Sequence, residues 1–271
     1  MLSYCIGRRL GAPRIICARQ LSSTLSPNPN WKLGEGATAS WKESSERSPR
    51  KSWNLAKTPP RDVYRLLTSA VVPRPIALVS TLSEDGTPNL APFSYFSMIS
   101  SNPPMLSVSF SLPPKRKKDT RENILFTKEF SVNLVHQAYV EAVNAAAVES
   151  SEPNEWLLSG LTMEPSVAIK APCVKESVVC LECELHSHQD IAPDADSAPT
   201  TTLVLGRIKH VHVREFSLNE DGVTLNPEKL SVVSRLGGLL YAKVSGSDVF
   251  EVPRTVWKDI KQDYAKIVDK K

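Results

Sequence analysis

The sequence predicts a mainly β protein with short helices, in which a β-barrel carries helices at its connections. Several segments of the 271-residue chain alternate apolar and polar residues with the period of a strand, and helical periodicity is confined to a few short stretches. No internal repeat or second composition regime follows residue 60. We therefore expect one barrel domain at 61–250, followed by an amphipathic C-terminal helix at 251–271.

Three strands are expected within residues 73–111. The first contains the apolar run 76–79, whose residue types pack well on a pleated sheet. A turn at Ser83–Gly86 follows, where Asp-Gly supplies the left-handed backbone of a hairpin loop. The return strand is expected at 89–98. The third strand, 105–111, alternates cleanly, with three apolar side chains on one face and three serines on the other.

The remaining elements follow in chain order. Helices are expected at 61–70, 121–126, 137–149 and 256–270, with a helical turn at 155–160. Asp119 or Thr120 is expected to be the N-cap of the second of these helices. Strands are expected at 129–135, 174–186 and 201–213, and a compact Ser-Arg-Leu-Gly-Gly turn lies within 230–244.

The charge is unevenly distributed. Residues 1–60 carry ten Lys/Arg and three Glu, a net +7, whereas the remaining 23 basic and 26 acidic residues give −3. A mildly acidic body gives no electrostatic reason to expect a nucleic-acid partner. The sequence has no apolar run long enough for a membrane-spanning helix.

Residues 1–24 are expected to be a mitochondrial transit peptide. The segment is rich in Arg and Ser and contains no acidic residue, and Arg19-Gln20-Leu21 before Ser22 resembles a mitochondrial processing site. The expected location is the mitochondrial matrix, with the cytoplasm as the alternative for a basic tail that targets nothing. Residues 25–60 are interpreted as a linker or arm whose tryptophans could dock on the surface.

The five cysteines do not suggest a disulfide framework. Only three lie in the body of the chain, and no Asn-x-Ser/Thr acceptor occurs, which favours a reducing, non-secreted compartment. The run from Cys180 through Cys183 to His186 and His188 has the residue types of a metal site. In a strand, however, residues three apart point to opposite faces, so Cys183 faces inward while Cys180, Glu182 and His186 face the other way. We therefore expect no metal there.

No P-loop, Rossmann fingerprint, zincin motif or nucleophile elbow is present. No His–carboxylate pair or nucleophile stands out, so the catalytic residues stay unknown. The basic run 115–118 is either a solvated loop or an anion site. Its place just before a helix start favours the second interpretation, because backbone N–H groups and the helix dipole attract phosphate there.

With these residues assembled, the chain resembles the flavin reductase-like family of FMN-binding split-barrel flavoproteins. The matching pieces run in consistent order over residues 61–245: Pro73–Ala77, Ser80-Thr81, Gly86, Asn89–Phe96, Asn102–Pro104, Lys118–Thr120, Asn123-Ile124, Phe130–Asn133, Glu155, Gly160-Leu161, and Ser234–Gly238 with Tyr241.

The resemblance implies a homodimeric split barrel that binds FMN near the subunit interface. A phosphate dianion needs hydroxyls, amides and a cation. Suppliers expected for it are Arg74, Ser109, Lys118 and Thr120. The isoalloxazine edge is expected to meet the backbone of two strands, at Ser80, Thr81, Ala91, Pro92, Phe93 and Ser94.

The leading functional hypothesis is an FMN-dependent oxidoreductase, with NAD(P)H:flavin reductase as its specific activity. The flavin would supply the redox chemistry, and NAD(P)H as electron donor is implied by the resemblance alone. The alternatives are a non-catalytic FMN-binding or electron-carrier protein, and a split-barrel interaction module that has lost flavin.

Overall fold

The computed structural model describes residues 26–114, 118–150, 152–244 and 246–269. The expected transit peptide lies outside the described residues, as does most of the basic run, 115–117. The chain divides into two compact units, one of residues 36–245 and the other of residues 1–35 with 246–271. Within the described ranges, no helix combines the length and the apolarity that a bilayer crossing requires.

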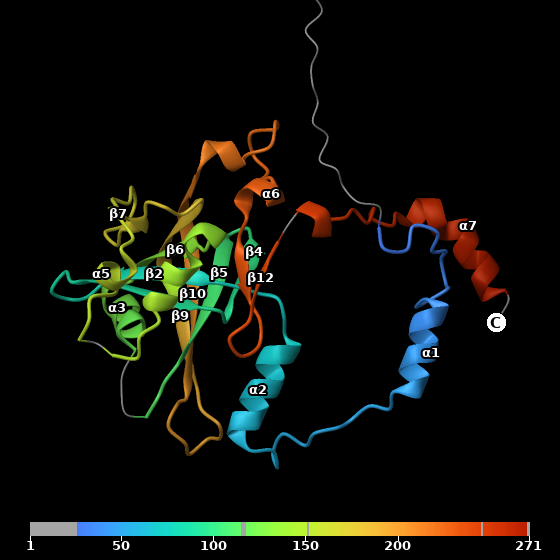
Figure 1. Ribbon diagram of the computed structural model, residues 1–271, viewed down its shortest axis with the longest axis horizontal. Coiled ribbons are helices and arrows are strands. Elements are labelled where there is room, and N and C mark those ends of the chain that lie inside the picture. Colours follow the sequence, from blue (N-terminus) through green and yellow to red (C-terminus); the bar gives the residue numbers. More distant parts are fainter. Residues whose placement is uncertain (1–25, 115–117, 151, 245, 270–271) are drawn as a thin grey trace, which may run out of the picture. The chain divides into compact units, whose positions relative to one another are not determined.

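A seven-stranded antiparallel sheet forms the body of the larger unit, so the mainly β expectation is confirmed (Figure 1). Its order is β3-β2-β6-β9-β10-β5-β4. The strands are β2 (Ala77–Leu82), β3 (Pro88–Phe93), β4 (Phe96–Ser101), β5 (Pro104–Ser111), β6 (Glu129–Leu134), β9 (Val179–Ile191) and β10 (Thr201–Val213). Two small sheets accompany it: β1 (Arg74–Pro75), β11 (Val233–Arg235) and β12 (Tyr241–Lys243) in one, and β7 (Met163–Glu164) with β8 (Cys173–Val174) in the other.

Short helices connect the strands. They are α1 (Ala39–Arg47), α2 (Pro60–Ala70), α3 (Asp119–Thr127), α4 (Val140–Ala145), α5 (Glu155–Ser159) and α6 (Pro227–Leu230), with 3-10 turns η1 (Gln137–Tyr139) and η2 (Glu215–Ser217). The smaller unit holds η3 (Gly246–Asp248) and α7 (Trp257–Val268). On α7, the rings of Trp257 and Tyr264 meet edge to face with centroids 5.4 Å apart.

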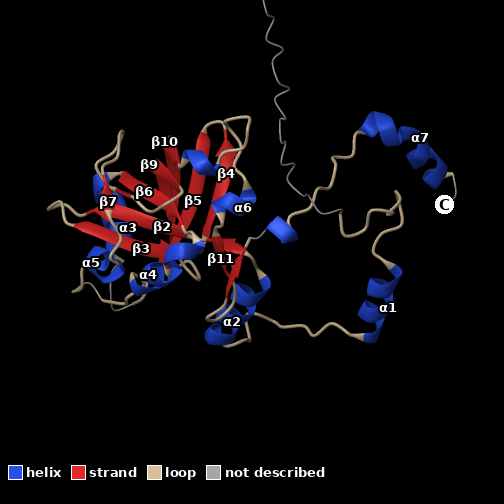
Figure 2. Cartoon of the chain, turned by 45° about the horizontal axis from the view of Figure 1, so that its top comes forward, coloured by secondary structure: helices blue, strands red, loops and turns tan. Residues whose placement is uncertain are grey.

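The large sheet curls around one apolar core. Figure 2 shows β2 and β3 running across the view and β4 and β5 running upward. Phe93 of β3, the first strand of the order, lies with its ring centroid 4.6 Å from that of Phe110 on β5, the sixth strand. Ile124 of α3 packs into the same core. Strands distant in the sheet order can share a core only if the sheet curls into a barrel. A second apolar cluster on the outer face of β2 includes Leu78 and Trp156.

The strand at β5 alternates as predicted. Its apolar residues Leu106, Val108 and Phe110 are buried in the barrel core, while Ser107 and Ser109 are half-buried on the outer face. The hairpin turn after β2 is also confirmed, because Gly86 has a φ of 83° in the left-handed region.

Three expectations about elements are corrected. The return strand 89–98 is two strands, because the chain bends at Ser94 and Tyr95 between β3 and β4. Pro92 and Ser94 are turn-forming residue types at this bend, but the aromatic residues around them favour a continuous strand. The helix expected at 137–149 is only η1 with α4, and the linker contains the unexpected α1. Trp41 of α1 is 66% exposed, so it does not dock within its unit.

Gly206 marks the closest approach in the barrel wall. A Cβ atom at this position would lie 2.4 Å from Cζ of Phe130 and 3.3 Å from a methyl of Leu106. Both neighbours are fully buried and cannot swing aside. We expect Gly206→Ala to lower the free energy of unfolding by about 1–3 kcal/mol through overpacking. Urea denaturation measures it, and an unchanged midpoint would show that the wall has room at this point.

Candidate functional site

The candidate site lies where the edge strand β3 meets the N-terminal turn of α3. β3 ends the sheet order, so one side of its backbone has no partner strand among the described residues. Unpaired N–H and C=O groups of an edge strand are available to bind another chain or a ligand. The side chain of Asn89 on β3 donates a 2.9 Å hydrogen bond to the hydroxyl of Thr120 on α3. This bond joins the strand edge to the helix start.

Four of the predicted residues, 91–94, lie together at the end of β3 and the bend after it. All four are half-buried, so they are neither sealed in the core nor fully solvated. Phe93 packs its ring against the barrel core. The backbone on either side of this ring is therefore held rigidly, which suits an edge that must recognise a planar ligand.

Ser109 of β5 lies close to this bend. Its backbone N–H donates a 2.9 Å hydrogen bond to the carbonyl of Tyr95, the second residue of the bend. Its side chain is on the outer, half-buried face of β5. Burial first, and then the neighbouring Tyr64, raises the pKa of Tyr95 above its usual range. The Tyr95 phenol consequently stays protonated at neutral pH.

Lys118 and Thr120 mark the start of α3. The helix begins at Asp119, so the N-cap is Lys118 rather than the expected Asp119 or Thr120. Thr120 is 2% exposed and accepts the bond from Asn89, so its hydroxyl serves the helix attachment. Lys118 is half-buried and extended, with φ −88° and ψ 111°. The first turn that it precedes presents backbone N–H groups without intrahelical partners, which is where anions bind.

The side of α3 away from β3 is tied to the β9–β10 hairpin. Arg121 donates a 3.0 Å hydrogen bond to the hydroxyl of Thr202 and contacts the carboxylate of Asp190 at 3.1 Å. Burial works against the charge of Arg121, but the carboxylates of Glu122 and Asp190 outweigh it and raise its pKa. The helix start is thus fixed on both sides.

We expect the free energy of unfolding of Asp190→Asn to depend less steeply on pH under acidic conditions than that of the wild type. The hydrogen bond from Thr202, and after it Arg121, lowers the pKa of Asp190. A lowered pKa in the folded state stabilises the protein above the unfolded value of about 4, and this stabilisation is lost as the pH falls through the folded pKa. The pair is partly exposed, so the loss is below about 1 kcal/mol. Urea denaturation at pH 7 and pH 3 measures it, and identical pH slopes in wild type and variant would contradict the assignment.

Ser80 and Thr81 are both fully buried and point to opposite faces of β2. The Thr81 hydroxyl accepts a 3.0 Å bond from Asn123 of α3, on the barrel-core side. The Ser80 hydroxyl has no hydrogen-bond partner among the described residues. Ser80 lies between Leu90 of β3 and Ser131 of β6, so its backbone is flanked by strands on both sides. Neither hydroxyl is accessible to a ligand at the β3 edge.

Arg74 also lies apart from the edge. Its guanidinium donates to the backbone carbonyls of Thr68 and Val71 at 2.6 Å, and to that of Leu236 at 3.0 Å. These bonds tie the end of α2 to the turn after β11. Thr120 is thus joined to the start of β3, and Ser109 to the bend that follows residues 91–94. Lys118 is the N-cap of α3, and Arg74 occupies a structural position.

Sequence reasoning missed a second polar cluster, on the outer face of β9. Cys173 of β8 and Cys180 of β9 form a disulfide, and His212 of β10 lies 2.5 Å from the carboxylate of Glu182. Cys183 faces the barrel core as expected, and Cys180 and Glu182 face the other way. The sequence run suggested only ligands along β9, whereas Cys173 and His212 come from neighbouring strands.

The architecture defines the class of protein, a split-barrel fold of the flavin reductase type. A Shewanella frigidimarina structure described as a flavin reductase with a split barrel domain superposes with a TM-score of 0.63 at 25% identity, covering 74% of this chain and 96% of that one. The structure of nitrilotriacetate monooxygenase component B from Bacillus cereus superposes with a TM-score of 0.71 at 33% identity, covering 76% of this chain and all of that one.

The sequence comparison agrees. The family model described as "Flavin reductase like domain" matches residues 68–242, and the chain belongs to this family. The uncharacterized protein YwrF of Bacillus subtilis is 38% identical over 187 residues, which are 68% of this chain and 90% of that protein. The split-barrel fold and the family resemblance expected from the sequence are both confirmed.

Proposed function

We propose that the chain is an FMN-binding flavoprotein oxidoreductase that acts as an NAD(P)H:flavin reductase. The observation that supports this most strongly is the joint position of the β3 edge and the α3 N-terminus, linked by the Asn89–Thr120 bond within a flavin reductase-like domain. The β3 edge offers backbone groups for a planar ring, and the α3 N-terminus offers the N-cap Lys118 and backbone N–H groups for a phosphate.

The donor set fits FMN. The ammonium of Lys118 and the N–H groups of the first α3 turn would bind the phosphate, and the hydroxyl of Ser109 would add a hydrogen bond. The backbone of residues 91–94 would orient the ring edge. FMN, when bound, would supply the hydride and electron chemistry, while the protein contributes binding, orientation and exclusion of water.

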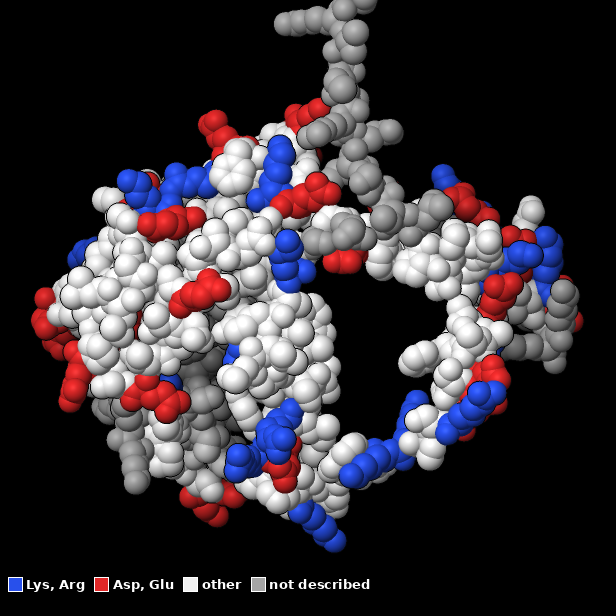
Figure 3. All heavy atoms as spheres, viewed as in Figure 1, with Lys and Arg blue, Asp and Glu red and all other residues white. Residues whose placement is uncertain are grey.

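A second copy of the chain is proposed to complete the site. Tyr95, Met98 and Ile99 are 43%, 65% and 48% exposed, and they lie on or next to the edge strand β4. Leu239 and Leu240, in the β11–β12 turn, are 90% and 65% exposed. Figure 3 shows a surface largely free of Lys, Arg, Asp and Glu around this hairpin.

Light scattering on wild type and Met98→Asp tests the dimer. The variant is expected to be a monomer, and two proteins of equal mass would refute this interface.

Two measurements on the purified full chain test the flavin proposal. Flavin absorbance bands are expected in the protein fraction after FMN is added and excess ligand is removed, and their absence would leave an interaction module. NADH and NADPH are then each mixed with the FMN-loaded protein without oxygen. Bleaching of the flavin band by either donor is expected. A band that neither donor bleaches would reject the reductase and favour a non-catalytic electron carrier.

A further inference from the structure

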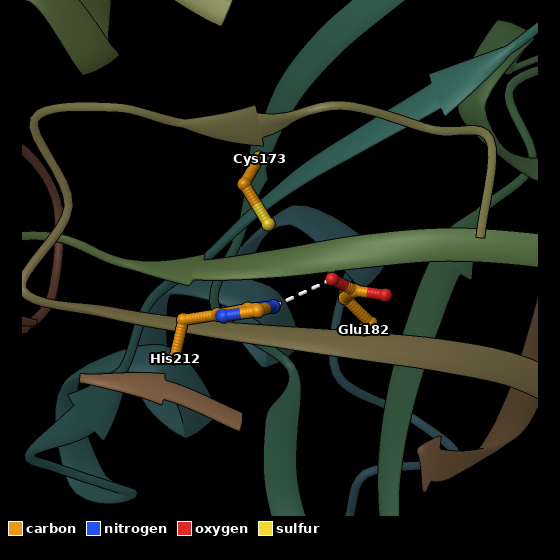
Figure 4. A group of neighbouring side chains, drawn as sticks. All are labelled: Cys173, Glu182 and His212. Atoms are coloured by element: carbon orange, nitrogen blue, oxygen red, sulfur yellow. Dashed lines mark hydrogen bonds and ion pairs between the residues drawn. The ribbon is translucent and has the colours of Figure 1, made fainter. Parts of the chain in front are cut away.

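The polar cluster on the outer face of β9 has the chemistry of a transition-metal site. One ligand atom each from Cys173, Glu182 and His212 lies within 4.8 Å of the others. Figure 4 shows the three side chains converging, with a ring nitrogen of His212 directed at the Glu182 carboxylate. A fourth ligand is adjacent, because Cys180 is bonded to Cys173 through the disulfide.

Sheet register explains the convergence. Cys180 lies directly opposite His212 in the β9–β10 pair, so their side chains share one face. Glu182 is two residues along the same strand and points to the same side. Cys173 reaches this face from β8. Four ligands from three strands therefore meet on one face, and rigid strands hold ligands more accurately than loops do.

We propose that, once the Cys173–Cys180 disulfide is reduced, both thiolates bind a Zn²⁺ ion together with His212 and Glu182. Two sulfurs, an imidazole nitrogen and a carboxylate oxygen make a four-coordinate set of the kind that zinc prefers. This site shares no residue with the proposed flavin site and does not depend on flavin binding.

The geometry requires only modest closure. Zn–S bonds of about 2.3 Å and Zn–N bonds of about 2.0 Å place the ligands of a tetrahedral ion roughly 3.3–3.8 Å apart. The His212–Glu182 hydrogen bond gives way as the ion enters between the two groups. The backbone N–H groups of Val167 and Ala168 donate to the Glu182 carboxylate at 2.7 and 2.6 Å. Such outer hydrogen bonds fix the orientation of a ligand and support its charge.

An entry path reaches the cluster. A cavity of about 320 Å³ is lined by Cys173, Cys180 and His212, with Arg214 also in its wall. The side chain of His212 is 41% exposed, whereas that of Glu182 is fully buried. Two thiolates and a carboxylate around Zn²⁺ leave one net negative charge. Arg214, in the wall of the same cavity, can compensate that charge.

The redox step balances through a dithiol reductant. The reductant transfers two electrons and two protons to the sulfur–sulfur bond, which breaks to give two protein thiols, while the dithiol becomes a disulfide. Zn²⁺ then displaces both thiol protons. A reducing compartment keeps protein thiols reduced and so would favour the metal-binding form. In the reverse step a disulfide oxidant accepts the two electrons by thiol–disulfide exchange and becomes a dithiol, while the protein disulfide re-forms and the ion is released.

Cobalt binding to the full chain tests the proposal directly. Co²⁺ bound to thiolates in a tetrahedral site absorbs at longer wavelengths than oxidised flavin. The reduced protein is expected to develop this absorbance at one equivalent, and Zn²⁺ is expected to abolish it. The protein with the disulfide intact is expected to show none. Equal absorbance in both redox forms, or in neither, would overturn the site.

A matched pair of histidine variants tests whether His212 is a metal ligand. His212→Ala is expected to weaken Co²⁺ binding by roughly tenfold or more. His186→Ala is the control, because His186 is exposed on β9 and belongs to the sequence run that resembles a metal motif. It is expected to bind like wild type. Equal loss in the two variants would overturn the assignment of His212.

Alkylation of the unmutated protein gives a readout that no folding defect can obscure. After reduction, Zn²⁺ is expected to slow iodoacetamide labelling of peptides containing Cys173 and Cys180 by roughly tenfold or more. Such slowing follows because a zinc-bound thiolate is masked as a nucleophile. Cys183 lies three residues from Cys180, so fragmentation of their shared peptide by tandem mass spectrometry assigns the label to one site or the other. Labelling that is unaffected by Zn²⁺ would refute coordination by the two sulfurs.

Discussion

Phe110→Ala is expected to lower the free energy of unfolding by about 3–5 kcal/mol, the usual cost of removing a buried aromatic ring. The Phe110 side chain is fully buried in the barrel core, where its ring packs edge to face against Phe93. The substitution removes apolar contact area and leaves a cavity that the strands on both sides cannot collapse to fill. Such a loss is a large fraction of the stability of an ordinary domain.

The matched control is Phe126→Ala. It makes the same chemical change on α3, at a side chain that is 56% exposed. We expect this variant to stay within about 0.5 kcal/mol of wild type. Urea denaturation gives both values, provided that the slope of the transition is unchanged. Equal losses in the two variants would contradict a barrel core centred on Phe110.

The local elements of the barrel could be predicted because their signals are local. β5 alternates in sequence and in burial, and the Asp-Gly turn after β2 needs only its own residues. The bend at Ser94 and Tyr95 could not be predicted in the same way. It forms because Phe93 and Phe96, on either side of it, both pack against one closed core. That constraint is tertiary, and the turn-forming types Pro92 and Ser94 alone do not predict it.

The sequence predicts the residue types of the candidate site better than it predicts their positions in the fold. Residues 91–94 lie at the end of an edge strand and Lys118 at a helix start, and their assignment to a flavin edge and a phosphate stays a prediction. From the sequence, Ser80 and Thr81 are expected to offer backbone groups to the ring. β2, however, lies between β3 and β6 in the sheet, and both side chains are fully buried. Arg74 is expected from the sequence to bind phosphate, but its guanidinium is bonded to backbone carbonyls, among them that of the distant Leu236. No sequence pattern predicts such partners.

The cluster around Glu182 also shows that sequence patterns predict local features and miss contacts between separate strands. The period-two argument correctly separated Cys183 from Cys180 and Glu182. A metal or disulfide partner, however, comes from whichever strand lies next in space. The periodicity of a single strand does not identify that neighbour. β8 and β10 supply Cys173 and His212, and their registers against β9 and its neighbours are set by the fold as a whole.

Lys118→Ala is expected to raise the Kd for FMN by roughly 10- to 150-fold and to change the Kd for riboflavin by less than about twofold. A hydrogen bond to a charged partner contributes about 1.5–3 kcal/mol, and 1.4 kcal/mol corresponds to a factor of ten. Riboflavin has the same ring and no phosphate, so it reports ring binding alone. Fluorescence titration of both ligands gives the two ratios.

Two further variants separate the position of the charge from its presence. Lys118→Arg retains a cation and is expected to recover most of the FMN affinity, although a guanidinium is shaped differently. Lys209→Ala removes one positive charge elsewhere on the barrel, where Lys209 pairs with Glu184 at 3.1 Å, and is expected to bind FMN like wild type. Because the α3 N-terminus remains intact in all three variants, residual affinity measures what the helix amides contribute. Losses of equal size for FMN and riboflavin in Lys118→Ala would place Lys118 outside the phosphate site and would move that site away from the start of α3.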